Sequence, residues 1–378
     1  MTAATLTEQD RLHLARALEL AELGRGRVSP NPLVGAVIAR EGETLGEGWH
    51  AEVGDLHAER AALADADRRD NDAAGATVFV TLEPCAHHGR QPPCTDALVQ
   101  ADVARVVYAA DDPSDKASGR GPDILRNAGI QVEIADGPEA VAARLQNQAF
   151  RKHARTGHPL VRLKSAVTLD GHTATASGDS RWISGPESRA LVHRWRSESD
   201  AVAIGIGTAL ADDPLLTARD LDPPAARQPL RVVFDSAARL PLKSALISSL
   251  EVAPLLVVAS STAPAEQVEA LREAGADVLA ADGDAEARVG AALTELGRRG
   301  VTSLMLEGGA HLAGAFLDGG HIDELRLFIA PLVLGGEGGR PLLAGADPEA
   351  IGEAKRAVAV NYERSGEDVL IRARLEEW

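Results

Sequence analysis

Three side chains that can bind a metal ion lie in one stretch of the chain, each beside the end of an expected helix or strand. His57 opens a segment of helical composition, Cys85 follows a β-branched apolar run over residues 77–82, and Cys94 follows a proline that suits the first turn of a helix. Helical and strand patterns alternate over residues 8–134, which indicates an α/β layer with a mostly parallel sheet. Such sheets bind ligands at the carboxyl ends of their strands, where we expect the three side chains.

One histidine and two cysteines, the only two in 378 residues, suit a zinc ion with a fourth position open for water. Zinc lowers the pKa of its bound water to about 7, and Glu59, two residues after the histidine, can take up and return the proton. Zinc nucleobase deaminases show this H-x-E…P-C-x-x-C pattern, although here eight residues separate the cysteines. Two alternatives stay open: a four-ligand structural zinc site completed by His87 or His88, and cysteines that bind no metal.

The net charge and the cysteine content indicate which binding partners and which cellular compartment suit the chain. The chain has 56 acidic and 39 basic side chains, and its net charge of −17 repels nucleic-acid phosphates and anionic membrane surfaces. No apolar run is long enough to span a bilayer, and the first residues show no signal-peptide pattern. Two cysteines fit a reducing compartment. We therefore expect a cytoplasmic protein that acts on small molecules, with no nucleic-acid or membrane partner. Its apolar strand pattern also favours a homo-oligomer, a dimer or tetramer.

The length of the chain favours two domains. We place them at residues 1–147 and 148–378. The segment 137–157 has helical composition without a strand pattern, and we expect one helix there that bridges the two domains.

The second half contains charged and glycine-rich positions next to apolar strands. An expected strand over residues 159–166 contains Lys164, and a lysine in such a strand is costly unless it faces an edge, a partner or a site. Another strand over 302–306 runs into Glu307-Gly308-Gly309 and a helix, which can hold phosphates on backbone N–H groups or form an ordinary tight turn. A second glycine run over 334–339 is either a loop near a cofactor or a plain linker.

The segments SPNPLVGAVI, HAE and TLEPCAHHGRQPPCTDAL resemble the deaminase half of the RibD family, bifunctional enzymes of riboflavin biosynthesis. The resemblance implies a cytidine-deaminase-like three-layer α/β/α domain. It implies one zinc ion on His57, Cys85 and Cys94, with Glu59 as the catalytic proton shuttle. The substrate contacts that it implies are Asn31, His50, His87 and Arg90. Ser114 stands where the family tends to have an asparagine, which puts a substrate contact of that residue in doubt.

The segments VRLKSAVTLDGHTATASGDSRWIS, HRWRSESDAVAIGIGTALADDPLLTAR and LEGGAHLAGAF resemble the reductase half of the same family, with a dihydrofolate-reductase-like α/β fold. The resemblance implies NADPH as hydride donor, and Lys164 and Glu307 are candidate catalytic groups at strand ends. The cofactor contacts expected are Val167, Trp182, Thr208, Asp212, Gly309, Ala310, His311, Leu312, Ala313, Gly314 and Ala315. The substrate contacts expected are Ser180, Arg196, Leu216, Arg219 and Glu307, of which the two arginines suit a phosphate.

The resemblance implies two consecutive reactions. The first is hydrolytic deamination of 2,5-diamino-6-ribosylamino-4(3H)-pyrimidinone 5′-phosphate, and the second is NADPH-dependent reduction of 5-amino-6-(5-phosphoribosylamino)uracil to the ribityl compound. Two other functions fit the residues less well. A nucleic-acid deaminase fused to a binding module conflicts with the acidic charge and the cysteine spacing. A structural zinc domain fused to a nucleotide sensor would release no ammonia.

Overall fold

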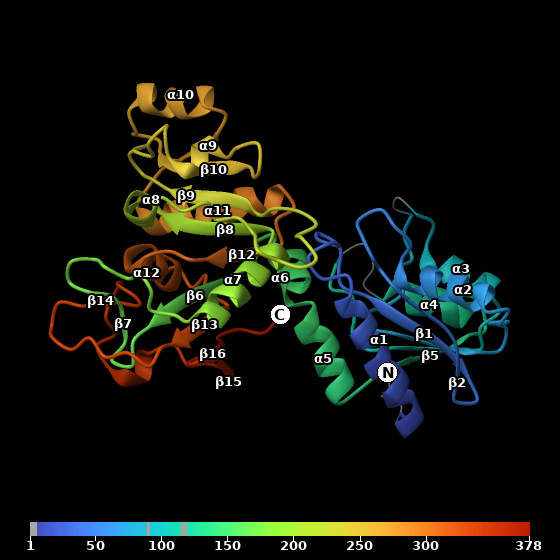
Figure 1. Cartoon of the computed structure of the whole chain (residues 1–378). Coiled ribbons are helices and arrows are strands. Elements are labelled where there is room, and N and C mark those ends of the chain that lie inside the picture. The colour runs from blue at the N-terminus through green and yellow to red at the C-terminus, as the bar shows by residue number, and fades with distance from the viewer. Residues whose placement is uncertain (1–5, 89–90, 115–118) are drawn as a thin grey trace. The chain divides into compact units, whose positions relative to one another are not determined.

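The computed structural model describes residues 6–88, 91–114 and 119–378. The chain forms two compact units, one of residues 1–157 with Trp378 and one of residues 158–377 (Figure 1). The functional boundary that we expect between residues 147 and 148 stays a prediction. No helix among the described residues is long and apolar enough to cross a bilayer.

A five-stranded sheet forms the middle of the first unit, in the order β2-β1-β3-β4-β5. Its strands are β1 (Gly35–Arg40), β2 (Glu43–Trp49), β3 (Thr77–Val80), β4 (Arg105–Tyr108) and β5 (Gln131–Ile134). β3, β4 and β5 are parallel, whereas β1 is antiparallel to both β2 and β3. The prediction of a mostly parallel sheet was therefore correct only for β3 to β5. The two-residue turn at Glu41 and Gly42, both with positive φ, reverses the chain into a hairpin.

Helices cover both faces of this sheet, as the predicted three-layer α/β/α fold requires. The helices are α1 (Glu8–Glu22), α2 (Ala58–Arg68), α3 (Cys94–Gln100), α4 (Arg120–Asn127), α5 (Pro138–Gln146) and α6 (Gln148–Thr156). Residues of α2, α3 and α4 share one apolar core with Ile38 and Val78, while residues of α1 and α5 share another with Val37 and Phe79. The alternation along each strand separates the two cores because successive side chains point to opposite faces.

Two glycines of β2 let α2 lie directly against the sheet. A Cβ atom on Gly48 would come within 2.2 Å of the Ala62 backbone nitrogen, and one on Gly46 within 2.4 Å of the Ala62 carbonyl oxygen. Both contacts are with backbone atoms, which cannot move without moving the helix. These glycines therefore determine where the first turn of α2 lies.

The helix expected over 137–157 is interrupted at Asn147, between α5 and α6. The Asn147 side chain accepts a hydrogen bond from the Leu33 amide and donates one to the Leu33 carbonyl, each at 2.8 Å. This pair of hydrogen bonds satisfies the backbone of a loop far away in sequence. The expectation of one continuous helix was wrong because composition does not reveal such a distant partner.

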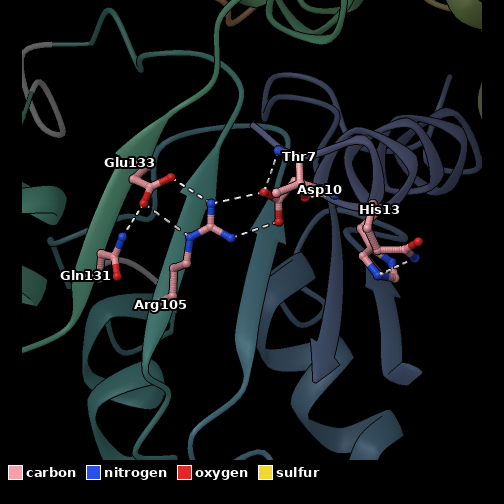
Figure 2. A network of polar contacts seen from close by, with 7 residues as sticks. Thr7, Asp10, His13, Arg105, Gln131 and Glu133 are labelled. Carbon is pink, nitrogen blue, oxygen red and sulfur yellow. Dashed lines mark hydrogen bonds and ion pairs between the residues drawn. The ribbon is translucent and has the colours of Figure 1, made fainter. Parts of the chain in front are cut away.

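A polar network lies at the opposite end of β4 from its carboxyl terminus (Figure 2). Arg105, the first residue of β4, donates hydrogen bonds to Asp10 of α1 and to Glu133 of β5. Asp10 also accepts a hydrogen bond from the Thr7 amide and completes the capping box of α1. The network joins α1 to the sheet, and it lies away from the candidate metal ligands, of which Cys85 follows the carboxyl end of β3.

The second unit contains a nine-stranded sheet in the order β11-β10-β9-β8-β12-β6-β13-β16-β15. Its strands are β6 (Leu160–Val167), β8 (Ala201–Gly205), β9 (Leu230–Phe234), β10 (Leu255–Ser260), β11 (Asp277–Ala281), β12 (Ser303–Leu306), β13 (Glu324–Ile329), β15 (Ala359–Ser365) and β16 (Asp368–Arg374). Neighbours from β11 to β13 are parallel, and β16 and β15 add the antiparallel members expected from the sequence. Strands β7 (His172–Ala174) and β14 (Arg340–Pro341) form a separate antiparallel pair.

Helices again cover both faces of this sheet (Figure 1). The helices are α7 (Pro186–Glu198), α8 (Ile206–Asp212), α9 (Ala245–Ser248), α10 (Ala265–Glu273), α11 (Ala285–Arg298) and α12 (Ala310–Asp318), with a short 3-10 turn at Ile351–Glu353. One core contains Leu293 of α11 and Phe316 of α12, and the other contains Trp195 of α7 and Leu271 of α10. The packing leaves the carboxyl ends of β8 and β12 beside the beginnings of α8 and α12.

Candidate active sites

The three expected metal ligands of the first unit lie close together. The Nδ1 atom of His57 is 3.5 Å from the Cys85 Sγ atom and 3.4 Å from the Cys94 Sγ atom, and all three atoms lie within 4.8 Å of one another. A tetrahedral zinc ion with ordinary Zn–S and Zn–N bond lengths separates a nitrogen and a sulfur ligand by about 3.6 Å. The three side chains therefore fit a zinc ion.

Local structure explains how each ligand is placed. His57 is the N-cap residue of α2, Cys85 follows β3, and Cys94 is the first residue of α3. The Cys94 amide donates to the Cys85 sulfur atom at 3.3 Å. A hydrogen bond with Cys94 lowers the pKa of Cys85 to about 4, and the start of α3 adds a positive dipole end that favours thiolate. His87 and His88, considered as a fourth ligand, are not in this group of metal-binding side chains.

Glu59 lies in the first turn of α2 and is buried. Burial, together with the charge of Cys85, raises the pKa of Glu59 to about 7. A carboxyl group that exchanges its proton near neutral pH is suited to general acid and base catalysis. Glu59, His57 and Cys85 line the same cavity of about 650 Å³.

Asn31 and His50 form a fixed pair in the wall of this cavity. The His50 Nδ1 atom donates to the Leu56 carbonyl at 3.1 Å, so Nε2 accepts from the Asn31 side-chain nitrogen at 3.0 Å. Burial lowers the pKa of His50 and keeps the ring neutral. The Asn31 carbonyl oxygen is thereby oriented as an acceptor, which suits recognition of amino groups on a small ring.

Two other residues of the expected substrate site lie in the wall of this cavity. His87 and Ser114 line the cavity, and the Ser114 amide donates to Asp112 at 2.8 Å. Arg90 lies outside the described residues. Sequence reasoning missed Phe150 and His153 of α6, which also line the cavity. The sequence pattern of residues 137–157 predicts only a bridging helix, and no motif marks Phe150 or His153 as cavity residues.

In the second unit, Glu307 at the end of β12 lies between two cations. Its carboxylate accepts hydrogen bonds from Arg196 at 2.7 and 3.0 Å and lies 3.7 Å from the Lys164 Nζ atom. Burial opposes its charge, but Arg196 and Lys164 lower the pKa of Glu307 to about 2. Burial also lowers the pKa of Lys164, which eases loss of its proton. Arg196 pairs with Glu307 in this structure, and its contact with a phosphate stays a prediction.

A cavity of about 850 Å³ lies beside this cluster in the second unit. The expected site residues that line it are Ser180, Thr208, Asp212, Gly309, Ala310, His311, Leu312 and Ala315. The expected residues that are not among its lining residues are Val167, Trp182, Lys164, Arg196, Leu216, Arg219, Glu307, Ala313 and Gly314. Ala313 and Gly314 belong to the packed side of α12, where a Cβ atom on Gly314 would overlap the Ala344 carbonyl oxygen.

The second glycine run leads into the same cavity. Amides of Leu334 and Gly335 donate to the Asp170 carboxylate, and Arg340 of β14, just after the run, lines the cavity. Sequence reasoning gave no role to Arg340, Ser236 or Arg288, which all line it. No motif marks these residues, since each comes from a different segment of the chain.

Protein-family models match both halves of the chain. The family model "RibD C-terminal domain" matches residues 159–371, and "Cytidine and deoxycytidylate deaminase zinc-binding region" matches residues 7–110. The RibD protein of Actinobacillus pleuropneumoniae is 37% identical over 97% of this chain and 95% of its own length. The RibD protein of Aquifex aeolicus is 39% identical over 97% of this chain and 98% of its own length. The chain belongs to the RibD family.

Solved RibD structures share the whole architecture. Acinetobacter baumannii RibD, form 1, superposes with a TM-score of 0.86 at 39% identity, covering 97% of this chain and 99% of that one. A Thermotoga maritima diaminohydroxyphosphoribosylaminopyrimidine deaminase/5-amino-6-(5-phosphoribosylamino)uracil reductase superposes with a TM-score of 0.84 at 33% identity, covering 97% and 98%. The expected pairing of a zinc-binding deaminase domain with a RibD reductase domain is confirmed, and the chain is a bifunctional enzyme of riboflavin biosynthesis.

Proposed function

We propose that the first unit deaminates 2,5-diamino-6-ribosylamino-4(3H)-pyrimidinone 5′-phosphate and that the second reduces 5-amino-6-(5-phosphoribosylamino)uracil with NADPH. The Thermotoga maritima relative is a diaminohydroxyphosphoribosylaminopyrimidine deaminase and 5-amino-6-(5-phosphoribosylamino)uracil reductase, which supports both substrates. Arg219 and Arg90 are the proposed phosphate contacts of the second and first units. A cytoplasmic location and a homodimer or homotetramer remain predictions from the sequence.

In the deaminase, one zinc ion held by His57, Cys85 and Cys94 would supply activation of a water molecule at neutral pH. Glu59 takes one proton from that water and gives it to the ring nitrogen as the C–O bond forms. It then moves the proton of the added hydroxyl group to the amino group, which leaves as ammonia when the C–N bond breaks, so that neither step needs another acid or base. Asn31 and His50 orient the pyrimidine, and His87 contacts it from the cavity wall. The observation that carries this proposal is the triangle of ligand atoms beside the buried Glu59 carboxyl group.

In the reductase, NADPH would supply a hydride to C1′ of the ribosyl group. Ring opening at that carbon requires a proton on the ring oxygen, and the Lys164 ammonium group is the proposed donor. Glu307 holds Lys164 at 3.7 Å and is itself oriented by Arg196. Hydride and proton together convert the ribosyl to the ribityl group. Ser180 and Leu216 are the proposed remaining substrate contacts, and the beginning of α12 would hold cofactor phosphate on its amides.

A pair of substitutions tests whether each unit carries out one of the two reactions. Glu59→Gln is expected to abolish ammonia release from the diaminopyrimidinone but to leave NADPH oxidation with the deaminated intermediate unchanged. Lys164→Met is expected to abolish NADPH oxidation with the deaminated intermediate but to leave ammonia release from the diaminopyrimidinone unchanged. The exposed residues Glu52 and Lys243 offer matched controls, Glu52→Gln and Lys243→Met. Ammonia release by Glu59→Gln at the wild-type rate would refute the role of Glu59.

A further inference from the structure

The cavity of the second unit extends across five neighbouring strands. Its wall includes Val258 of β10, Phe234 of β9, Gly205 of β8, Gly308 after β12 and Ser165 of β6, and these strands are adjacent in this order. At a strand spacing of about 4.8 Å, five strands cover roughly 19 Å. That length suits a dinucleotide lying across the sheet edge, with a different part of the ligand at each strand.

The residues that line this cavity give the dinucleotide a direction. Gly309 and Ala310, at the start of α12, lie in the middle of the wall, where helix amides favour a pyrophosphate. Lys164 and Glu307 directly precede Ser165 and Gly308, so the reacting group lies on the β12–β6 side. The nicotinamide must reach that side, and the adenosine half therefore lies against β9, β10 and the beginning of α11.

Arg288 is the cation at the adenosine end. Among the described residues, the only arginine or lysine side chains that line the cavity are Arg288 and Arg340. Arg340 lies beside Gly178 on the other side, since its Nη2 atom is 2.7 Å from the position of a Cβ atom there. Arg288 occupies the first turns of α11 and donates from Nη1 to the Gly283 carbonyl. That bond uses one of five N–H donors, which leaves a fork that matches a phosphate.

Acidic residues near Arg288 do not prevent its guanidinium group from binding a phosphate. Asp284 and Glu286 also begin α11, but they are exposed and do not line the cavity. Asp235 does line it, yet its side chain is fully buried and accepts from the Leu240 amide at 2.8 Å, with Arg239 3.7 Å from its other oxygen. Asp235 thus closes the turn after β9, and the neighbouring Ser236 is the exposed residue with a hydroxyl group for the ligand.

We propose that Arg288 binds the 2′-phosphate of NADPH and sets the preference of the reductase for NADPH over NADH. The inference rests on the proposed dinucleotide-dependent reduction. The 2′-phosphate is the one group by which the two cofactors differ, and it belongs to the adenosine half. A charge-assisted contact of this kind corresponds to a 10- to 100-fold difference in affinity.

The test uses the full-length protein and two small probes. Calorimetry measures binding of adenosine 2′,5′-bisphosphate, which carries the 2′-phosphate, and of 5′-AMP, which lacks it. Arg288→Ala should weaken binding of the bisphosphate by 10- to 100-fold and leave binding of 5′-AMP unchanged. Arg288→Lys should retain part of the difference in affinity between the two probes. Arg298→Ala is the control, because Arg298 lies on the same helix about 15 Å further along and pairs with Glu295.

Steady-state reduction provides the second readout. Arg288→Ala should raise the KM for NADPH by the same factor, without changing kcat or the kinetics with NADH. Equal bisphosphate affinity in wild type and Arg288→Ala, or equal use of NADH and NADPH by the wild type, would overturn the proposal. A wild-type protein that oxidises neither cofactor would instead contradict the proposed reductase function itself.

Discussion

The Glu307 carboxylate lies in the fork of the Arg196 guanidinium, with nitrogen–oxygen distances of 2.7 and 3.0 Å. The two residues come from the last turn of α7 and the end of β12, and both side chains are largely buried. A bidentate pair fixes direction as well as distance. The Lys164 ammonium group, 3.7 Å away, therefore faces a carboxylate whose orientation is fixed.

Removal of Arg196 should destabilise the second unit. Arg196→Ala leaves the Glu307 carboxylate buried with Lys164 as its remaining cation, and breaking such a pair costs about 3–5 kcal/mol. Hydrogen exchange of peptides from β12 in increasing urea measures this local stability. Arg272→Ala, which removes an exposed pair with Glu269, should change little. Equal protection of β12 in both variants would argue against a structural role of Arg196.

Acid should weaken the second unit through Glu324. Burial opposes the charge of this residue, but Arg326 and Arg162 lower its pKa to about 2, against an unfolded value near 4.5. A depressed folded pKa contributes stability that is complete above about pH 4.5 and is lost as the pH falls toward 2. The difference corresponds to about 3 kcal/mol.

Glu324→Gln provides the comparison. The variant should be less stable than wild type at pH 7, and its free energy of unfolding should fall less between pH 5 and pH 3. Urea unfolding at pH 7, pH 5 and pH 3, monitored by hydrogen exchange of β13, measures the free energy of unfolding and its change with pH. Parallel pH profiles for the two proteins would show that Glu324 does not carry this acid sensitivity.

Zinc content should depend on three side chains. Cys94→Ala should lower bound zinc well below one per chain and abolish deamination, because two ligands hold the ion far more weakly than three. His88→Ala should retain both zinc and activity, since His88 lies outside the ligand group. Metal analysis of the purified variants decides the matter. Loss of zinc in His88→Ala would indicate a four-ligand structural site instead.

A single methyl group on Gly48 should impair deamination without touching the cavity. The Cβ atom of Gly48→Ala would meet the backbone of Ala58 and Ala62, so α2 must shift and take His57 with it. We expect a loss of about 2 kcal/mol or more in the first unit, lower zinc affinity and unchanged reduction. Gly290→Ala, in the open middle of α11, should leave both activities intact and stabilise its helix slightly.

The sequence by itself predicted the alternating helices and strands of the first unit and the zinc-binding chemistry of its candidate metal site. The apolar alternation at Ile38, Val78 and Phe79 produced two cores on opposite faces of one sheet, because a strand separates successive side chains. The three candidate ligands and Glu59 stand out in the sequence because their residue types have few other uses in this spacing. Local patterns carry this information, since they depend on neighbours along the chain.

Only the tertiary structure decided which distant residues meet. Strand β8 lies between β9 and β12, so Ser236 and Gly309 line one cavity with Arg288 although Gly309 follows Ser236 by 73 positions. Asn147 ends α5 because Leu33 lies beside it, and Arg196 reaches Glu307 because α7 packs over the end of β12. These contacts depend on strand order and helix placement. The pattern of a single segment does not contain them.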